Sequence, residues 1–420
     1  MYPAKVLVVH NRYQQRGGED GVFEREVALL RSKGHEVIEY LETNDGVGPT
    51  NAWKSGFEAI WSRETTGRLR QILRQEQPDI AHFHNTFARI SPAAYYACRQ
   101  SGVPVVQTLH NFRIGCLNAC CLTNDRPCER CLPQLIPVAG ILKGCYRGSS
   151  ATSAAMAAIT TSHKMLGTYK NQVDAYIALT EFARGIHVRS GLPGHKLHVK
   201  PNFSEGQPES GGTRSPFALF VGRLCPEKGV TPLIDAWRKA APALPLKIVG
   251  DGPSAPEVAA AAAEIPGVEW LGLRNHAEVM ALMRSAQFLV MPSLWYENFP
   301  LCIVEAFSVG LPCVVSQLGS MQEIVEHGQT GLHFRAGDAA DLAAQALWMA
   351  SHPDQCLQMG RTARVRFEQL YTPEHNYRRL IEIYQHATLH FQQLPQNNQI
   401  HPARNHNFYS EKNSTPVTRN

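Results

Sequence analysis

Two positively charged side chains stand five residues apart in a glycine-bounded segment of the second half of the chain. Arg223 and Lys228 follow a short apolar run, residues 217–221, and lie within the segment 222–229, which begins and ends with glycine. Arginine supplies a planar fork of donors and lysine a mobile point charge, and together they suit a diphosphate. The alternative is a solvated surface loop, but a position directly after a strand favours the diphosphate site.

Two glutamates follow another apolar run, residues 288–291. Pro300 is a typical first-turn helix residue, which places Glu297 in the loop before a helix and Glu305 on its second turn. A carboxylate accepts hydrogen bonds from two neighbouring hydroxyls, as in holding a ribose or a hexose. Because Glu305 lies in an otherwise apolar helix start, it needs a partner, either a ligand or a core arginine or backbone group.

The first half of the chain carries polar residues at similar places. Gly17 and Gly18 follow the apolar run 5–9 and predict a phosphate-sized loop after a buried strand. Three further polar residues come at the ends of later apolar runs: His84, Asn85 and His110. Strand-end histidines are often structural, and among these His110 is favoured because Asn111 follows it ahead of an unusual cysteine-rich loop.

Six of the eleven cysteines fall in that loop, residues 116–147. Cys116, Cys128, Cys131 and Cys145 could supply four thiolates to a tetrahedral structural zinc ion in a reducing compartment. One Cys-x-x-Cys with two isolated cysteines falls short of the paired pattern, so reduced thiols on a loop are the alternative. The loop also carries several basic residues.

A scaffold of parallel strands would bring these loop residues together. Short apolar runs alternate with helical periodicity throughout, which predicts an α/β fold of two doubly wound, Rossmann-like domains facing each other across a cleft. The expected strands cover residues 5–9, 37–40, 79–83, 103–108, 174–179, 217–221, 246–249, 268–271, 288–291, 313–315 and 332–334. The expected divisions are a first domain over 1–200 with the cysteine-rich insertion 116–147, a second domain with a closing helix over 201–390, and a disordered tail over 391–420.

Composition excludes several classes of protein. The chain has 420 residues, and 41 Lys plus Arg against 36 Asp plus Glu leave a mild net charge of +5, so no nucleic-acid partner is expected. No uncharged apolar run reaches the roughly 18 residues of a spanning helix, and the N-terminus lacks the apolar stretch of a secretion signal. We therefore expect a cytoplasmic protein, with 11 cysteines that do not form a disulfide framework.

The motifs together resemble glycosyltransferase family 4, the retaining, nucleotide-sugar-dependent enzymes of the GT-B fold. The resemblance rests on residues 221–229, the segment 250–253 (GDGP), the seven residues between Glu297 and Glu305, and the segment 328–331 (GQTG). In the first half, residues 16–21 resemble the family's glycine-rich loop, and residues 79–85 with 108–111 resemble its acceptor-side histidine strands. The resemblance covers about residues 4 to 390.

The resemblance implies a role for each matching residue. Arg223 and Lys228 would hold the diphosphate, Glu305 the ribose hydroxyls and Glu297 the hydroxyls of the transferred sugar. Gly17 and Gly18 would offer backbone amides to the phosphates, and His110 would lie near the anomeric centre, with His84 and Asn85 on the acceptor side. Asn298 and Pro300 stand where many family members have glycine, which puts the details of donor contact in doubt.

The resemblance also implies a hexose-type sugar, a nucleoside diphosphate-sugar donor and a saccharide or lipid-linked acceptor in polysaccharide or surface-glycan biosynthesis. None of the ten aspartates forms an Asp-x-Asp pair, so no catalytic metal is expected. Aromatic and basic residues between Trp53 and Arg74 leave peripheral membrane contact open, although a solvated helix is favoured over it. The competing functions are a nucleotide-sugar epimerase of the same architecture and a non-catalytic nucleotide-sugar binding protein.

Overall fold

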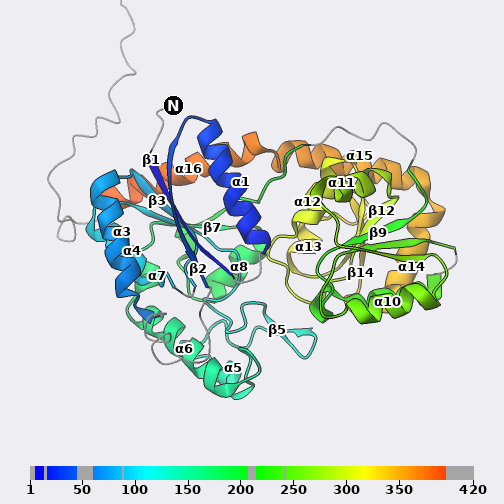
Figure 1. The fold of residues 1–420 in the computed structure, drawn as a ribbon, viewed down its shortest axis with the longest axis horizontal. Helices are drawn as coiled ribbons and strands as arrows, with labels where there is room; N and C mark the ends of the chain where they lie inside the picture. Colours follow the sequence, from blue (N-terminus) through cyan, green and yellow to red (C-terminus); the bar gives the residue numbers. More distant parts are fainter. Residues whose placement is uncertain are drawn as a thin grey trace, which may run out of the picture.

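The computed structural model describes residues 5–13, 17–44, 60–87, 89–206, 214–240 and 243–393. Arg16 of the glycine-rich segment, Trp53 and Lys54 of the possible membrane contact, and residues 394–420 of the expected tail lie outside these ranges. The described residues form two α/β domains, each built on a six-stranded parallel sheet (Figure 1). The predicted fold class is confirmed.

The first sheet has the strand order β2-β1-β3-β4-β7-β8, and every neighbouring pair is parallel. Its strands are β1 (Lys5–Arg12), β2 (Glu36–Thr43), β3 (Ile80–Asn85), β4 (Val105–Thr108), β7 (Ala175–Ala178) and β8 (Leu197–Val199). The edge strand β8 was not predicted, because three residues are too few to show an alternating pattern.

The second sheet has the order β11-β10-β9-β12-β13-β14, again parallel throughout. Its strands are β9 (Ala218–Val221), β10 (Leu246–Val249), β11 (Val268–Gly272), β12 (Phe288–Met291), β13 (Cys313–Ser316) and β14 (Gly331–Phe334). All six agree with the predicted runs to within one residue at each end. Strands buried on both faces, such as β12 and β13, read as nearly continuous apolar runs, which is why the sequence located them so closely.

Helices cover both faces of each sheet. In the first half they are α1 (Gly18–Ser32), α3 (Arg63–Glu76), α4 (Ala93–Gln100), α5 (Val138–Leu142), α6 (Ser150–Met165), α7 (Thr168–Asn171) and α8 (Glu181–Arg189). In the second half they are α9 (Val230–Ala240), α10 (Ala255–Glu264), α11 (His276–Ser285), α12 (Leu301–Ser308), α13 (Gly319–Ile324), α14 (Ala339–Ser351), α15 (Pro353–Leu370) and α16 (Pro373–Gln392). Each half also has a short 3₁₀ turn, η2 (Gly194–Lys196) in the first and η3 (Pro226–Lys228) in the second. None of the described helices is both long and apolar enough to cross a bilayer.

Helix α1 has one apolar face, and this face is buried in the first domain. Phe23, Val27 and Leu30 are at most 4% exposed, and the chain turns out of the helix at Gly34, whose φ of +86° favours glycine. Glu26 of the same helix is charged, yet its side chain is also buried, with 1% of it exposed.

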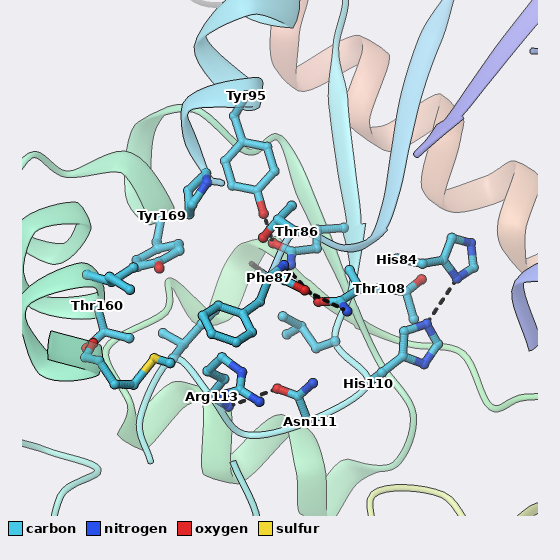
Figure 2. Close-up of a pocket in the computed structure, with 17 residues that line it drawn as sticks. His84, Thr86, Phe87, Tyr95, Thr108, His110, Asn111, Arg113, Thr160 and Tyr169 are labelled. Atoms are coloured by element: carbon cyan, nitrogen blue, oxygen red, sulfur yellow. Dashed lines mark hydrogen bonds between the residues drawn. The ribbon is translucent and has the colours of Figure 1, made fainter. Parts of the chain in front are cut away.

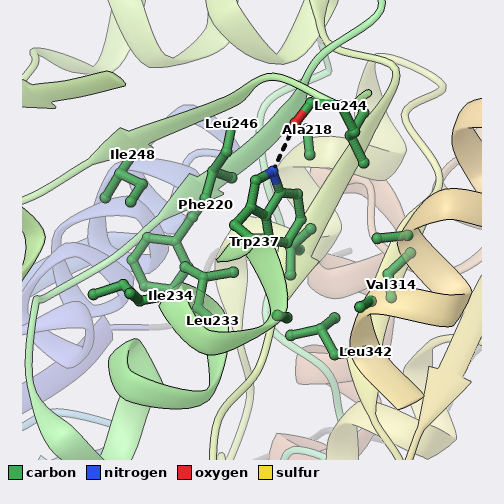
Figure 3. Close-up of a cluster of buried hydrophobic side chains, with 14 of the residues drawn as sticks. Ala218, Phe220, Leu233, Ile234, Trp237, Leu244, Leu246, Ile248, Val314 and Leu342 are labelled. Carbon is green, nitrogen blue, oxygen red and sulfur yellow. Dashed lines mark hydrogen bonds between the residues drawn. The ribbon is translucent and has the colours of Figure 1, made fainter. Parts of the chain in front are cut away.

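The core of the second domain is centred on Trp237 of α9 (Figure 3). Its indole packs among buried side chains of the sheet such as Phe220 and Ile248, and its Nε1 donates to the carbonyl oxygen of Leu244 at 2.9 Å. A buried indole N–H without an acceptor would destabilise the fold, and this bond removes that penalty.

The last helix, α16, leaves the second domain and packs on the first (Figure 1). Leu380, Ile383, Tyr384 and Ala387 lie in the same buried cluster as side chains of β1, β3 and β7. By sequence order this helix was assigned to the second domain. The structure places it with the first, because its apolar face is buried against the first sheet.

Strand order decides where the chemistry-bearing loops meet. In the second sheet the order reverses between β9 and β12, and in the first between β1 and β3. Ligands in open parallel sheets bind beyond the carboxyl ends of strands at such reversals. The loops after β1, β3, β9 and β12 carry most of the site residues predicted from the sequence.

Candidate functional site

The loops after β9 and β12 form one connected surface. The backbone N–H of Leu294 donates to the carbonyl oxygen of Glu227 at 2.9 Å, which joins the two loops. Gly229 has a φ of +73°, and a Cβ there would overlap the carbonyl oxygen of Pro292. Glycine is therefore required at residue 229, directly after Lys228.

Lys228 and Glu297, predicted to bind different parts of a donor, form an ion pair at 2.7 Å. Ser293 Oγ and Trp295 Nε1 also donate to Glu297, each at 2.7 Å, and all three donors bind the same oxygen, Oε1. Burial alone would lower the pKa of Lys228, but the attraction of Glu297 raises it, so the ammonium stays charged. Glu297 is only 6% exposed, and no described residue donates to its Oε2, which leaves that oxygen for a ligand.

Arg223 lies on the same loop as Lys228 and is exposed. It forms no ion pair with the described residues. A guanidinium in this position, beside the ammonium of Lys228, is able to bind an anion from the cleft.

Glu305 lies on α12, as predicted, with a side chain that is 14% exposed. Burial raises the pKa of this carboxyl, and the neighbouring His276 and Arg25 oppose the rise. Arg25 Nη1 lies 3.8 Å from Glu305 Oε1 and His276 Nδ1 lies 3.9 Å from it. The partner that the sequence analysis required is therefore an arginine, and it comes from α1 of the other domain.

Gly17 and Gly18 lie at the N-terminus of α1, and both are exposed. The N–H of Gly17 donates to Asp20 Oδ2 at 2.7 Å, while Asp20 Oδ1 lies 2.8 Å from His10 Nε2. The Gly17 amide is thus engaged within its own domain in this structure. A Cβ on Gly18 would meet nothing within 4 Å, so the space beside Gly18 is open to a ligand.

His84 and His110 are brought together from the ends of β3 and β4. His84 Nδ1 and His110 Nε2 lie 3.0 Å apart, and the two rings stack with centroids 5.2 Å apart. Burial lowers the pKa of His84 to about 4 and that of His110 well below its usual value, with neighbouring histidines adding to both shifts. Both rings are neutral at physiological pH, and one donates to the other.

Asn85 lies beside this pair but bonds within the first domain. Its amide donates to the carbonyl oxygen of Asn11 at 2.8 Å and to Glu19 Oε1 at 3.2 Å. Its side chain therefore joins the end of β3 to the end of β1 and to α1, although it also lines the pocket described below.

A direct hydrogen bond joins the two halves of the site. Asn298 donates from Nδ2 to the carbonyl oxygen of Leu109 at 2.7 Å. Because Leu109 precedes His110, this bond holds the loop with Glu297 against the strand end with the histidine pair. Pro300 is the residue that immediately precedes helix α12.

Sequence reasoning missed several contributors. Trp295 and Ser293 stand within four residues of Glu297, and their donor groups were a signal that could have been used. Arg25 gave no such signal, because its role depends on a residue 280 positions away in the other domain.

A buried charged cluster beneath the histidine pair was also missed. Glu26 Oε2 and Lys200 Nζ form an ion pair at 2.7 Å, and each side chain is 1% exposed. Glu26 Oε1 lies 3.1 Å from His82 Nδ1 and 3.2 Å from His84 Nε2. Glu26, His82 and His84 have the spacing of a metal site, but the ammonium of Lys200 already supplies the positive charge that a cation would bring.

The cysteine-rich insertion folds around a small pocket of its own. Cys116, Cys128, Cys131 and Cys145 all line it, and neither Cys120 nor Cys121 does. Every cysteine of the described chain is a free thiol. Within this insertion Glu129 accepts from Tyr296 of the second domain at 3.0 Å, so the insertion touches the loop that carries Glu297.

A further pocket opens at the carboxyl ends of β3 and β4 (Figure 2). Its lining includes His84, His110, Asn111 and Arg113, together with apolar and aromatic side chains from α6 and α7. The pocket lies at the strand ends for which the sequence analysis predicts an acceptor site.

Comparisons with known proteins agree with this architecture. The family described as Glycosyltransferase Family 4 matches residues 22–204, and the family described as Glycosyl transferases group 1 matches residues 215–352. The first match falls in the first domain and the second match in the second domain.

Among curated proteins, the D-rhamnosyltransferase WbpZ of Pseudomonas aeruginosa is 34% identical over 160 residues, which are 37% of this chain and 42% of that protein. Glycogen synthase of Mycobacterium tuberculosis is 35% identical over 154 residues, or 35% of this chain and 37% of that enzyme. This chain therefore aligns with less than half the length of either relative.

Among solved structures, the Anabaena protein HepE in complex with UDP superposes with a TM-score of 0.63 over 90% of this chain and 98% of HepE, at 17% identity. That likeness establishes the fold. From the two family matches and the two-domain architecture, the chain belongs to the family 4, group 1 glycosyltransferases of the GT-B fold.

Proposed function

We propose that this protein transfers a hexose-type sugar from a nucleoside diphosphate-sugar to a saccharide or lipid-linked acceptor in polysaccharide or surface-glycan biosynthesis. The bond between the anomeric carbon and the diphosphate oxygen breaks, and the diphosphate leaves with the electron pair. An acceptor hydroxyl oxygen bonds to the anomeric carbon, and its proton passes to the leaving diphosphate.

One observation carries the proposal. The loop in which Glu297 is fixed by Lys228, Ser293 and Trp295 is docked through Asn298 onto the strand end beside His110. A donor bound at the loop would therefore lie between a cationic site for its diphosphate and the neutral histidines of the acceptor side.

The positive charges of Arg223 and Lys228 determine their roles in this proposal. Arg223 and Lys228 bind the diphosphate and stabilise the negative charge that grows on it as it leaves, a role for which cationic side chains are well suited. Two cations in these loops serve where a metal ion would otherwise be needed, so the proposal includes no catalytic metal.

The carboxylates complete the donor site in this proposal. Glu305 accepts from the ribose hydroxyls, and Oε2 of Glu297 accepts from a hydroxyl of the transferred sugar. Neutral His110 has Nε2 bonded to His84, and its Nδ1, which bonds to no described residue, is available for a sugar hydroxyl.

The names of similar proteins support the donor class. HepE has been solved with UDP and with UDP-glucose, and WbpZ is a rhamnosyltransferase. Retention of the anomeric configuration is proposed from the family resemblance, and nuclear magnetic resonance of the anomeric proton in the product tests it.

Calorimetric titration of the purified protein with UDP, GDP and ADP tests the proposal. We expect one nucleotide to bind and to raise the melting temperature, since a ligand that binds only the folded state stabilises it. Lys228→Gln and Glu305→Gln should each weaken binding about tenfold or more, a loss of about 1.4 kcal/mol. Lys239→Ala on the exposed side of α9 is the matched control and should bind normally.

Failure of all three nucleotides to bind the folded protein would refute the proposal. An epimerase is distinguished by incubation of the corresponding nucleotide-sugar without acceptor, since only the epimerase would change the sugar under those conditions. A non-catalytic binding protein would bind the nucleotide-sugar and never release free nucleotide when acceptors are supplied.

A further inference from the structure

The acceptor-side pocket of the first domain contains a charged group whose hydrogen-bonding capacity the protein does not fill (Figure 2). The pocket adjoins the His84–His110 pair and is bounded by apolar side chains such as Met156 and Ile159. Arg113 projects among these groups beside Phe87. Its position places it within the space where the proposed function requires an acceptor.

The guanidinium of Arg113 is held in place but only partly satisfied. Its central carbon lies 4.4 Å from the centre of the Phe87 ring, which is a cation–π contact. The hydroxyl of Tyr13 interacts with the group, yet its Nε and Nη1 are buried and have no hydrogen-bond partner. Buried donors of a charged group normally find an acceptor, because leaving them unpaired costs about 1–3 kcal/mol or more.

The charge of Arg113 persists in this setting. Burial alone would lower its pKa, but the neighbouring Tyr13 and Tyr146 raise it. The nearby carboxyl of Glu19 does not offset this charge at neutral pH, because burial and the adjacent Asp20 raise its pKa to about 8. The pocket is thus cationic, with an apolar wall.

We propose that Arg113 binds an anionic group of the acceptor, a carboxylate or a phosphate, in this pocket. The inference rests on the proposed function, because it specifies the substrate class of the same site. Guanidinium groups bind both anions through charge-assisted hydrogen bonds, and the apolar wall holds the remainder of the acceptor. The acceptor is therefore an acidic or phosphorylated saccharide rather than a neutral one.

The test compares anionic and neutral probes that share one sugar ring. Glucuronic acid and glucose 6-phosphate supply the carboxylate and the phosphate, glucose is the neutral control, and each is titrated calorimetrically into the full-length protein. We expect one of the anionic probes to bind at least tenfold more tightly than glucose. Which of the two binds identifies the anion.

Variants show whether Arg113 is responsible. Arg113→Gln should abolish the preference for the anion, and Arg113→Lys should keep part of it, since a lysine retains the charge without the planar fork. Arg126→Gln changes an exposed arginine of the same domain and should leave the preference unchanged. Circular dichroism establishes that each variant is folded.

Equal binding of anionic and neutral probes by the unaltered protein would overturn the inference, and this result needs no variant. An anion preference that survives in folded Arg113→Gln would overturn it as well. Nucleotide binding measured on the same samples separates the two proposals. Binding of a nucleotide without an anion preference contradicts only the inference about the acceptor, whereas absence of nucleotide binding contradicts the proposed function.

A second inference has an independent basis in the cysteine-rich insertion. Four cysteines spread over residues 116–145 converge on one small pocket, and these are the four selected from the sequence. A Cβ on Gly140, which also lines the pocket, would lie 3.3 Å from Cys131 Sγ and 2.9 Å from a methyl carbon of Leu117. Glycine at residue 140 therefore allows the thiols to approach.

We propose that Cys116, Cys128, Cys131 and Cys145 bind a structural zinc ion as four thiolates. No three of these sulfur atoms lie within 4.8 Å of one another in the described structure, so their side chains must rotate toward the pocket centre to bind the ion. The ion would fix Glu129, which lies between two of the ligands, in its contact with Tyr296 next to Glu297. Zinc would thereby stabilise the contact between the insertion and the loop after β12.

Elemental analysis of protein purified without chelator tests this proposal. We expect about one zinc per chain, loss of zinc in Cys128→Ser, and retention in Cys120→Ser, which changes a neighbouring cysteine outside the pocket lining. Chelation should lower the melting temperature of the unaltered protein and of Cys120→Ser alike. Folded protein that contains no zinc and gains no stability from added zinc would overturn the proposal.

Discussion

The buried ion pair between Glu26 and Lys200 offers the sharpest test of how the first domain is stabilised. The two side chains are each 1% exposed and their charged atoms are 2.7 Å apart. Burial would raise the pKa of Glu26, but the attraction of Lys200 and His82 holds it well below its usual range. Glu26 is therefore charged, and its charge depends on Lys200.

Lys200→Met removes the positive partner while keeping the length of the side chain. An uncompensated buried charge of this kind costs about 3–5 kcal/mol, and we expect that loss in the free energy of unfolding. The double variant Glu26→Gln with Lys200→Met removes both charges and should recover at least about 2 kcal/mol of the loss. The measurement is urea denaturation followed by circular dichroism.

Lys247→Met is the matched control, because Lys247 pairs with Glu269 at 3.6 Å with both side chains at least one-third exposed. An exposed pair contributes at most about 1 kcal/mol, so this variant should unfold almost normally. If Lys200→Met is no more destabilising than Lys247→Met, the attribution of stability to the buried pair is wrong.

Three further predictions address the loops, the acid stability and the core. Gly229→Ala should destabilise the protein by about 1–3 kcal/mol in thermal denaturation, because the residue has a positive φ and faces the Pro292 carbonyl, whereas Gly18→Ala, with open space beside it, should not. As the pH drops from 6.5 toward 4, His84 should lower the free energy of unfolding by up to about 3 kcal/mol, because its imidazole binds a proton in the unfolded chain and not in the folded one. A His84→Asn variant that loses as much stability over the same pH range would contradict this role of His84. Trp237→Ala should lower the free energy of unfolding by about 3–5 kcal/mol, because it leaves a cavity in the core and an unpaired carbonyl at Leu244. Urea denaturation measures this loss, and a loss under about 1 kcal/mol would be inconsistent with the packing in Figure 3.

The sequence predicted the sheets closely because their signal is local. A strand buried on both faces is apolar at every position, so residues 288–291 coincide with β12. The short strand β8 carried too little of this signal. The assignment of α16 to the wrong domain has the same origin, since periodicity reveals that a helix has an apolar face but not which sheet covers it.

Part of the candidate site was also predictable, because its residues lie in loops whose place relative to the sheet follows from the strand pattern. Loops that follow parallel strands emerge at one edge of a sheet, so the residue types in those loops were enough to point to Arg223, Lys228, Glu297 and His110. Which of them touch one another depends on strand order, and the contact of Lys228 with Glu297 is a consequence of β9 lying beside β12.

By itself, then, the sequence determined the alternation of strands and helices, the two-domain organisation and the loops that carry the charged groups, because each of these is encoded within a few neighbouring residues. Only the tertiary structure decided the contacts between distant segments: Arg25 with Glu305, Glu26 with Lys200, and Arg113 with two unpaired donors in its pocket. These charged side chains are buried because both domains and the last helix pack together. A local pattern of residues does not reveal this packing, so it does not distinguish these charges from surface charges.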